Sequence, residues 1–183
     1  MNLHVFVDES RRGRVYLLAA TLIASRDLAP TRALMRGLRS RGERRVHFTH
    51  ERDTIQKDIA ARLVAAALRT RIYQGQGRSE AVRDQCLRAA VSDIAPEGVL
   101  RLVLESRDHK GNLSDRRTIQ SALTSCGTSP DLAYEHMFAH EEPALWVPDA
   151  IAWCYGAGGE WRRRIEPIVE KTVNLGTIAR RRR

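Results

Sequence analysis

The feature that most constrains the fold is a pair of apolar runs at the start of the chain. Residues 3–8 form a β-branched and aromatic run that ends in an acid, and Glu9 and Ser10 follow it directly; this composition is typical of a strand. Residues 11–14 are turn-like, and residues 15–24 are almost wholly apolar. Two such runs joined by a short turn predict an antiparallel hairpin whose first strand ends in carboxylates.

Beyond the hairpin, the hydrophobic pattern alternates between helical and strand periods. It predicts helices over residues 29–41, 54–69, 80–95, 114–125 (with Ser114 as N-cap), from Pro148 onward and over 161–171, and strands over residues 46–48, 71–75, 99–105 and 132–139. This order predicts an α/β fold, with a mixed sheet and helices on its faces. The length of 183 residues fits a single domain, 1–178, followed by a basic tail, 179–183.

The charge balance favours a polyanionic partner. The chain has 31 lysines and arginines against 22 acids, a formal net charge of +9, and nucleic acid is the expected partner of such a surface. Only Lys57, Lys110 and Lys171 are lysines, and guanidinium groups suit phosphate contacts. A GC-rich coding bias would produce the same excess of arginine.

Cysteine usage and hydropathy exclude several other classes. Cys86, Cys126 and Cys154 are odd in number and widely spaced, which indicates neither a disulfide framework nor a structural zinc site. No leader-like segment opens the chain, and no apolar run is long enough for a membrane span. We expect a cytoplasmic protein without membrane contact. A homodimer is compatible with the sequence.

Three acids occupy positions that suit a metal site. Asp8 and Glu105 each end a predicted strand, and Asp149 lies near the start of a C-terminal helix. Mg²⁺ and Mn²⁺ prefer oxygen ligands, and carboxylates from separate elements that meet at one sheet edge can hold them for phosphodiester cleavage. Taken singly, each acid is also explained by the end of a strand or by the dipole at a helix N-terminus.

Short motifs in the chain are similar to those of one catalogued family. The chain resembles the domain of unknown function 3800 family in Val5-Phe6-Val7-Asp8-Glu9-Ser10, in Arg45-Val46-His47-Phe48 and in the run from Leu145 to Trp153. Members of that family are regarded as ribonuclease H-like, with acids arranged as in metal-dependent nucleases. The resemblance implies an active site with Asp8, Glu105 and Asp149.

The chain also departs from the family pattern. In the family, glycine follows Asp-Glu-Ser directly, whereas Arg11 and Arg12 precede Gly13 here. Arg45 stands where the family has a glutamate. Trp146 and Pro148 stand where it has glutamine and alanine. The identity of a fourth metal ligand is therefore open, and three acids are candidates: Glu43, Glu51 and Asp53. An inactive relative remains an alternative.

Histidines and tryptophans add further candidates. His47 is a candidate proton relay or phosphate ligand, with a structural role as the alternative; a zinc site from His47, His50 and Glu51 lacks a fourth ligand. Asp108 and His109 belong either to the site or to a loop cap. The three tryptophans are candidates either for stacking on bases or for packing in the core: Trp146, Trp153 and Trp161.

These patterns predict a metal-dependent nuclease or phosphodiesterase acting on RNA or DNA. Asp8, Glu105 and Asp149 are the expected Mg²⁺ or Mn²⁺ ligands and catalytic groups, with Glu9 and His47 assisting. Phosphate contacts are expected from four arginines: Arg11, Arg12, Arg44 and Arg45. The alternatives are an inactive nucleic-acid binding module and a protein-interaction module in a defence or toxin system.

Overall fold

The predicted hairpin forms the centre of a larger sheet in the computed structural model, which describes residues 2–127 and 132–178. Strands β1 (Leu3–Arg12) and β2 (Val15–Ala24) pair antiparallel. They extend into a six-stranded sheet of order β5-β4-β1-β2-β3-β6, in which β2 alone runs against the others. The tail proposed at 179–183 lies outside the described residues.

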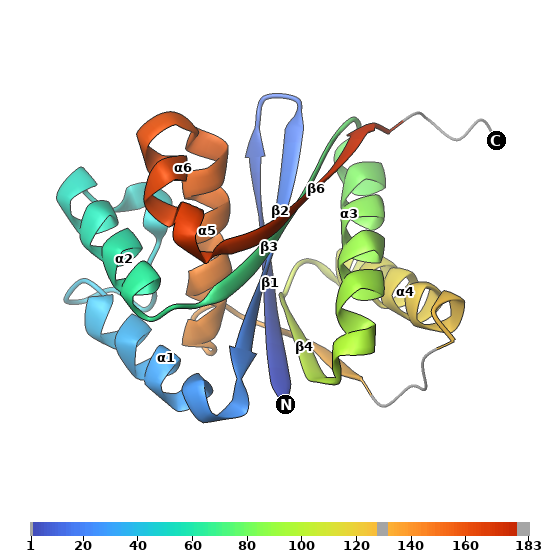
Figure 1. Cartoon of the computed structure of the whole chain (residues 1–183), viewed down its shortest axis with the longest axis horizontal. Coiled ribbons are helices and arrows are strands. Elements are labelled where there is room, and N and C mark those ends of the chain that lie inside the picture. Colours follow the sequence, from blue (N-terminus) through green and yellow to red (C-terminus); the bar gives the residue numbers. More distant parts are fainter. Residues whose placement is uncertain (1, 128–131, 179–183) are drawn as a thin grey trace.

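The remaining elements follow in chain order and cover both faces of the sheet. Their bounds are α1 (Ser25–Leu38), α2 (Asp53–Ala65), β3 (Arg69–Gln76), α3 (Ser79–Ile94), β4 (Val99–Glu105), α4 (His109–Ser125), β5 (Ala133–Met137), α5 (Trp146–Ala157), α6 (Gly159–Ile165) and β6 (Val169–Thr177). Short 3₁₀ turns occupy Phe48–His50, Ala95–Glu97, Pro143–Leu145 and Glu166–Ile168. Helices α1, α2, α5 and α6 lie on one side of the sheet, and α3 and α4 on the other (Figure 1).

Alternation along β1 divides the core into two layers. Phe6 packs in the layer under α5, whereas Val5 and Val7 pack in the layer under α3 and α4. Successive side chains of a strand point to opposite faces, so Asp8 projects toward α5 and Glu9 toward α3. The two adjacent acids therefore enter different environments.

Helix α5 approaches the hairpin unusually closely. A Cβ at Gly156 would lie 2.8 Å from Leu17 Cδ1 and 3.0 Å from Arg12 Cγ, so a larger residue here would require these side chains to shift. Helix α5 packs across β1 and β2. Asp149 lies in the first turn of this helix.

One predicted strand was wrong, and two predicted helices have different bounds in the structure. The strand expected at 46–48 is instead a 3₁₀ turn over Phe48–His50. Helix α4 begins at His109, and its cap is Asp108 rather than Ser114; the Asp108 carboxylate accepts a 2.6 Å hydrogen bond from the Gly111 N–H. The final helix ends at Ile165, and residues 169–177 form the edge strand β6, paired parallel with β3. None of the described helices is both long and apolar enough to cross a membrane.

Candidate active site

Two of the predicted acids lie side by side at one edge of the sheet. The parallel register pairs Val7 of β1 with Leu104 of β4, so Asp8 and Glu105 are the next residues on neighbouring strands, which are about 4.8 Å apart. Phe6 and Val103 pack in the layer under α5, and side-chain alternation places both acids on that same face. Asp149 joins them from the first turn of α5.

Burial and mutual repulsion act together on Asp8. The residue is 7% exposed, and its Oδ1 accepts a 2.7 Å hydrogen bond from the Glu9 backbone N–H. Burial, and then the charges of Asp149, Glu105 and Glu9, raise the pKa of Asp8 well above its usual value, against the lowering effect of that hydrogen bond. The negative form of this carboxyl group is therefore unfavourable unless a cation compensates it.

Asp149 experiences the same environment. Burial and the charge of Glu105 raise the pKa of Asp149 to about 6, although a backbone hydrogen bond from Phe48 and the charge of Arg45 act in the opposite direction. Two buried carboxyl groups with raised pKa values and a third nearby carboxylate therefore share one edge of the sheet. Carboxyl groups whose pKa values are raised in this way are typical of functional sites.

Glu105 is the outermost of the three acids. Its Oε1 accepts a 2.8 Å hydrogen bond from Arg45 Nη1, and both side chains are about one-third exposed. They line a cleft of about 410 Å³ whose walls are formed by residues 42–45, His47, Glu105 and residues 138–140. The arginine expected to contact phosphate thus pairs with one of the expected metal ligands.

The chemistry of this donor set fits a divalent cation, because three carboxylates supply the oxygen ligands that Mg²⁺ and Mn²⁺ prefer. Their spacing is wider than a bound ion requires: in the described part of the chain, no three histidine, cysteine or acidic side chains are close enough together to hold a metal. The Arg45 guanidinium partly neutralises Glu105 in this arrangement.

Glu9 lies on the opposite face of the sheet. Its carboxylate pairs with Arg83 of α3, and Arg83 also donates hydrogen bonds of 2.9 and 2.8 Å to Asp115 of α4. Glu9 influences Asp8 through its charge, but it does not line the cleft that contains Glu105.

The histidine motif lies at the cleft wall. The rings of His47 and His50 are parallel, with centroids 4.1 Å apart. Burial and the charges of Arg45 and His50 lower the pKa of His47, which favours the neutral ring. Its Nδ1 is buried, and no partner for it is found within the described residues.

The three candidates for a fourth ligand differ in their contacts. Glu43 lines the cleft together with Glu105. Glu51 accepts a 3.1 Å hydrogen bond from the Ser40 hydroxyl, and Asp53 pairs with Lys57 at 2.6 Å. Glu43 is therefore the candidate that shares a cavity with the main site.

The predicted arginines fall into two groups. Arg44 and Arg45 line the cleft, whereas Arg12 lies over the Trp153 ring, 4.9 Å from its centroid, and Arg11 is exposed on the hairpin.

All three tryptophans contribute to packing. Trp146 is buried, and Trp153 and Trp161 pack edge-to-face beside Phe48.

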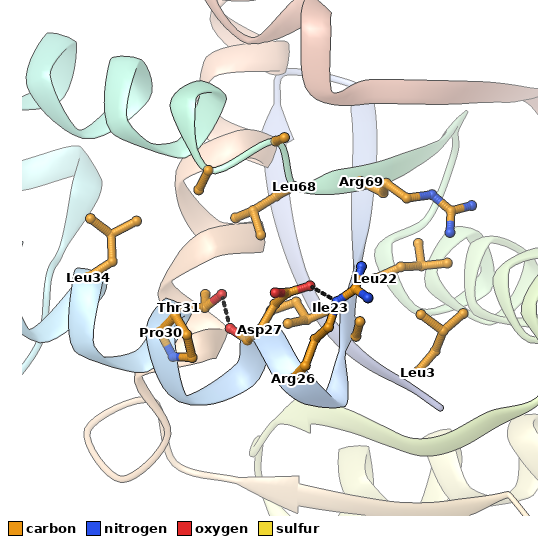
Figure 2. A pocket seen from close by; sticks show the side chains of 13 residues that line it. Leu3, Leu22, Ile23, Arg26, Asp27, Pro30, Thr31, Leu34, Leu68 and Arg69 are labelled. Carbon is orange, nitrogen blue, oxygen red and sulfur yellow. Dashed lines mark hydrogen bonds and ion pairs between the residues drawn. The ribbon is translucent and has the colours of Figure 1, made fainter. Parts of the chain in front are cut away.

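A second cavity, of about 460 Å³, lies far from these acids. It is lined by the N-terminal end of β1, the β2–α1 junction and the segment from Ala66 to Arg69. Figure 2 shows the Arg26–Asp27 ion pair and the Thr31–Asp27 hydrogen bond beside apolar side chains such as Leu22 and Leu68. The acids expected to be catalytic are absent from its lining.

Sequence reasoning missed two features of the site region. One is Arg83, a buried arginine in α3 that compensates Glu9; an arginine within an amphipathic helix gives no local signal for this role. The other is the exposed Phe138 at the cleft wall. An aromatic residue directly after a strand, next to the acidic loop, was the available signal.

Comparisons with known proteins support the fold. No protein-family model and no curated protein sequence matches the chain, so the similarity to the family named above stays a resemblance. The chain is similar to a chain in the structure of the PCNA:RNase HII complex from Archaeoglobus fulgidus, with a TM-score of 0.52 and 17% identity over 91% of this chain and 74% of that one. With its hairpin-centred mixed sheet and helices on both faces, the protein has an α/β, ribonuclease H-like fold.

Proposed function

We propose that the protein is a divalent-metal-dependent nuclease that cleaves RNA or DNA, with Asp8, Glu105 and Asp149 as the metal ligands. One observation carries this proposal: Asp8 is buried beside two further carboxyl groups that raise its pKa. Among the described residues, no cationic side chain forms an ion pair with Asp8 or Asp149. Two adjacent carboxylates without an ion-pair partner favour an external cation.

The chain's own residues would divide the work. Asp8 and Asp149, fixed on β1 and α5, would bind the cation from the buried side, and Glu105 would complete the ligand set once Arg45 releases it. The bound Mg²⁺ or Mn²⁺ would supply activation of water and stabilisation of the leaving oxygen. Arg44 and Arg45 would orient the substrate phosphate at the mouth of the cleft. Neutral His47 would accept or donate a proton there.

Substitution of Asp8 tests the proposal. We expect Asp8→Asn to lower the rate of oligonucleotide cleavage in Mg²⁺ or Mn²⁺ by at least about a hundredfold, because loss even of outer-shell partners of metal ligands commonly costs 10–100-fold. Cleavage is measured on labelled single-stranded, duplex and hybrid RNA and DNA. Asp58→Asn, which alters an exposed acid on α2, serves as the matched control. A parental rate in Asp8→Asn would contradict the proposal.

The pairing of Arg45 with Glu105 favours a second candidate function. If this pair is permanent, the protein would retain the fold as an inactive nucleic-acid binding or protein-interaction module, for example in a defence or toxin system. Calorimetric titration with Mn²⁺ separates the two functions. A nuclease binds the ion at Asp8 and Asp149, and Asp8→Asn removes the heat of binding; the module gives no such heat in either protein.

A further inference from the structure

The geometry points to a binding site for an unpaired nucleobase on the exposed Phe138–His140 stack beside the candidate active site. This inference rests on the proposed function and deepens it, because it assigns single-stranded nucleic acid as the substrate class. It uses residues that neither the carboxylate cluster nor the phosphate-binding arginines include.

The stack lies one step from the acids. Glu105 of β4 pairs in register with Met137 of β5, so Phe138 is the first residue beyond the row that contains Glu105. Phe138 and His140 line the same cleft as Arg44, Arg45 and Glu105. A strand whose phosphate contacts these arginines can therefore place an adjacent base against the aromatic rings.

The apolar side chain of Phe138 is exposed to solvent, which is energetically unfavourable. It is 54% exposed, more than Leu100 at 44% and Leu113 at 39%, the other large hydrophobic side chains that are exposed in the described part of the chain. Its ring stacks on His140 with centroids 5.6 Å apart and planes inclined by 21°. An exposed aromatic surface beside cationic side chains is the combination that single-strand binding proteins use.

The turn that carries the two rings is held in place from below. Ala139, between them, is 6% exposed, and its carbonyl oxygen accepts a 2.5 Å hydrogen bond from the indole N–H of buried Trp146. The Phe138 carbonyl oxygen accepts a 2.9 Å hydrogen bond from the Glu141 N–H. Arg32 of α1 anchors the following residue, Glu142, through both carboxylate oxygens. A base would therefore meet a preformed surface, at little ordering cost.

The occupant is an unpaired base rather than a duplex. In a duplex, both faces of an internal base are covered by its neighbours, so a side-chain ring reaches a face only where the base is unstacked. The cleft arginines supply phosphate contacts that do not depend on the base. Base and phosphate contacts should therefore respond separately to substitution.

The experiment measures binding of the full-length protein in EDTA, which prevents metal-dependent cleavage. The probes are fluorescein-labelled single-stranded 12-mers of RNA and of DNA, an abasic 12-mer with the same backbone charge, and a blunt duplex. We expect Phe138→Ala to weaken binding of a base-bearing single strand by about five- to 150-fold, which is the range for loss of one base–aromatic stack. Affinity for the abasic strand and the duplex should stay within about twofold.

Two variants serve as controls. Leu113→Ala removes an exposed apolar side chain from α4 and should leave all affinities unchanged. Phe138→Trp should restore binding of the base-bearing strand and give tryptophan quenching on saturation, because indole also stacks on bases. Restoration by tryptophan distinguishes stacking from damage to the fold.

The inference is overturned if Phe138→Ala binds every probe with the affinity of the parent. It is also overturned if the substitution weakens binding of the abasic strand as much as binding of the base-bearing strand. A third contradicting result is a change in the oligomeric mass measured by light scattering without any change in nucleic-acid binding, which would identify the Phe138 ring as a contact between copies of the chain. These outcomes are separate from failure of the proposed function. A protein that shows Phe138-dependent binding but no Asp8-dependent cleavage retains the stack without the nuclease.

Discussion

The consecutive acids Asp8 and Glu9 belong to one strand, yet only Glu9 has a paired arginine on its face of the sheet among the described residues. On the α3 and α4 face, Glu9 pairs with Arg83, which also binds Asp115 through two hydrogen bonds. On the α5 face, Asp8 has Asp149 and Glu105 nearby and no ion pair among the described residues. The first face resembles a completed structural network, whereas on the second face the only ion pair of the cluster among the described residues is between Arg45 and Glu105.

The pKa values express this contrast. Burial alone would raise the pKa of Asp115, but hydrogen bonds from Arg83 and His136 and the charges of Arg83 and Arg107 lower it to about 2. The pKa of Asp149, without such partners, rises to about 6. Burial raises the pKa of both groups, and the partner charges decide the direction of the net shift. An uncompensated cluster weakens the fold, so its presence favours a functional role over a structural one.

The largest expected effect is on the compensated face. Arg83→Met should lower the free energy of unfolding by about 3–5 kcal/mol, because it leaves the buried Asp115 and the partly buried Glu9 without their counter-ion. Chemical denaturation at pH 7 measures the change. Arg88→Met, which loses a hydrogen bond from an exposed arginine to Ser121, is the matched control and should cost less than about 1 kcal/mol. Equal effects of both substitutions would remove the contrast between the faces.

A pH series on Asp149→Asn and Asp115→Asn compares the faces directly. The folded pKa of Asp149 lies above its unfolded value, so the parent loses stability as pH rises from about 4 through 6. In EDTA, Asp149→Asn should therefore gain up to about 3 kcal/mol relative to the parent at pH 8 and nothing below pH 4.

For Asp115, the folded pKa is depressed, so its contribution is present above pH 4 and disappears as pH falls toward 2. Asp115→Asn should lose about 2 kcal/mol relative to the parent at pH 7. Thermal or urea unfolding across pH 3–8 gives both curves. Parallel curves for the two variants would show that the faces do not differ in charge compensation.

The smallest expected effect concerns Arg45, whose guanidinium forms an ion pair with Glu105 of the carboxylate cluster. Arg45→Gln should increase Mn²⁺ affinity by up to about fivefold in calorimetry, since a partly exposed ion pair contributes about 0.2–1 kcal/mol and Glu105 would be released from it. The same substitution should weaken binding of every oligonucleotide, with or without bases. An unchanged Mn²⁺ affinity would mean that Arg45 does not compete with the ion.

Much of the fold follows from local patterns, because the hairpin and the strand ending at Glu105 combine a clear period with clear turn residues. Local patterns did not predict the edge strand β6. Residues 169–177 are largely exposed and polar, so their strand conformation depends on pairing with β3. The 3₁₀ turn at Phe48 likewise depends on tertiary contacts, since Phe48 packs against Trp153 and Trp161.

For the site, strand ends indicated that Asp8 and Glu105 would meet, because parallel neighbours end at one edge. The sequence did not indicate that Arg45 would pair with Glu105 or that Glu9 would face Arg83, since both contacts join segments 60 or more residues apart. The roles of Asp8, Glu9, Glu105, Asp149 and His47 stay predictions until the variants are measured.

The close contact at Gly156 has a consequence for how an ion would be coordinated. A Cβ at Gly156 would meet the Leu17 side chain of the hairpin, so the close packing of α5 on β1 and β2 couples the position of Asp149 to that of the hairpin. If a divalent ion binds, Glu105 would be the ligand held by Arg45 on the solvent side, so that a phosphate engaging Arg45 would free Glu105 for the ion and couple the two binding events.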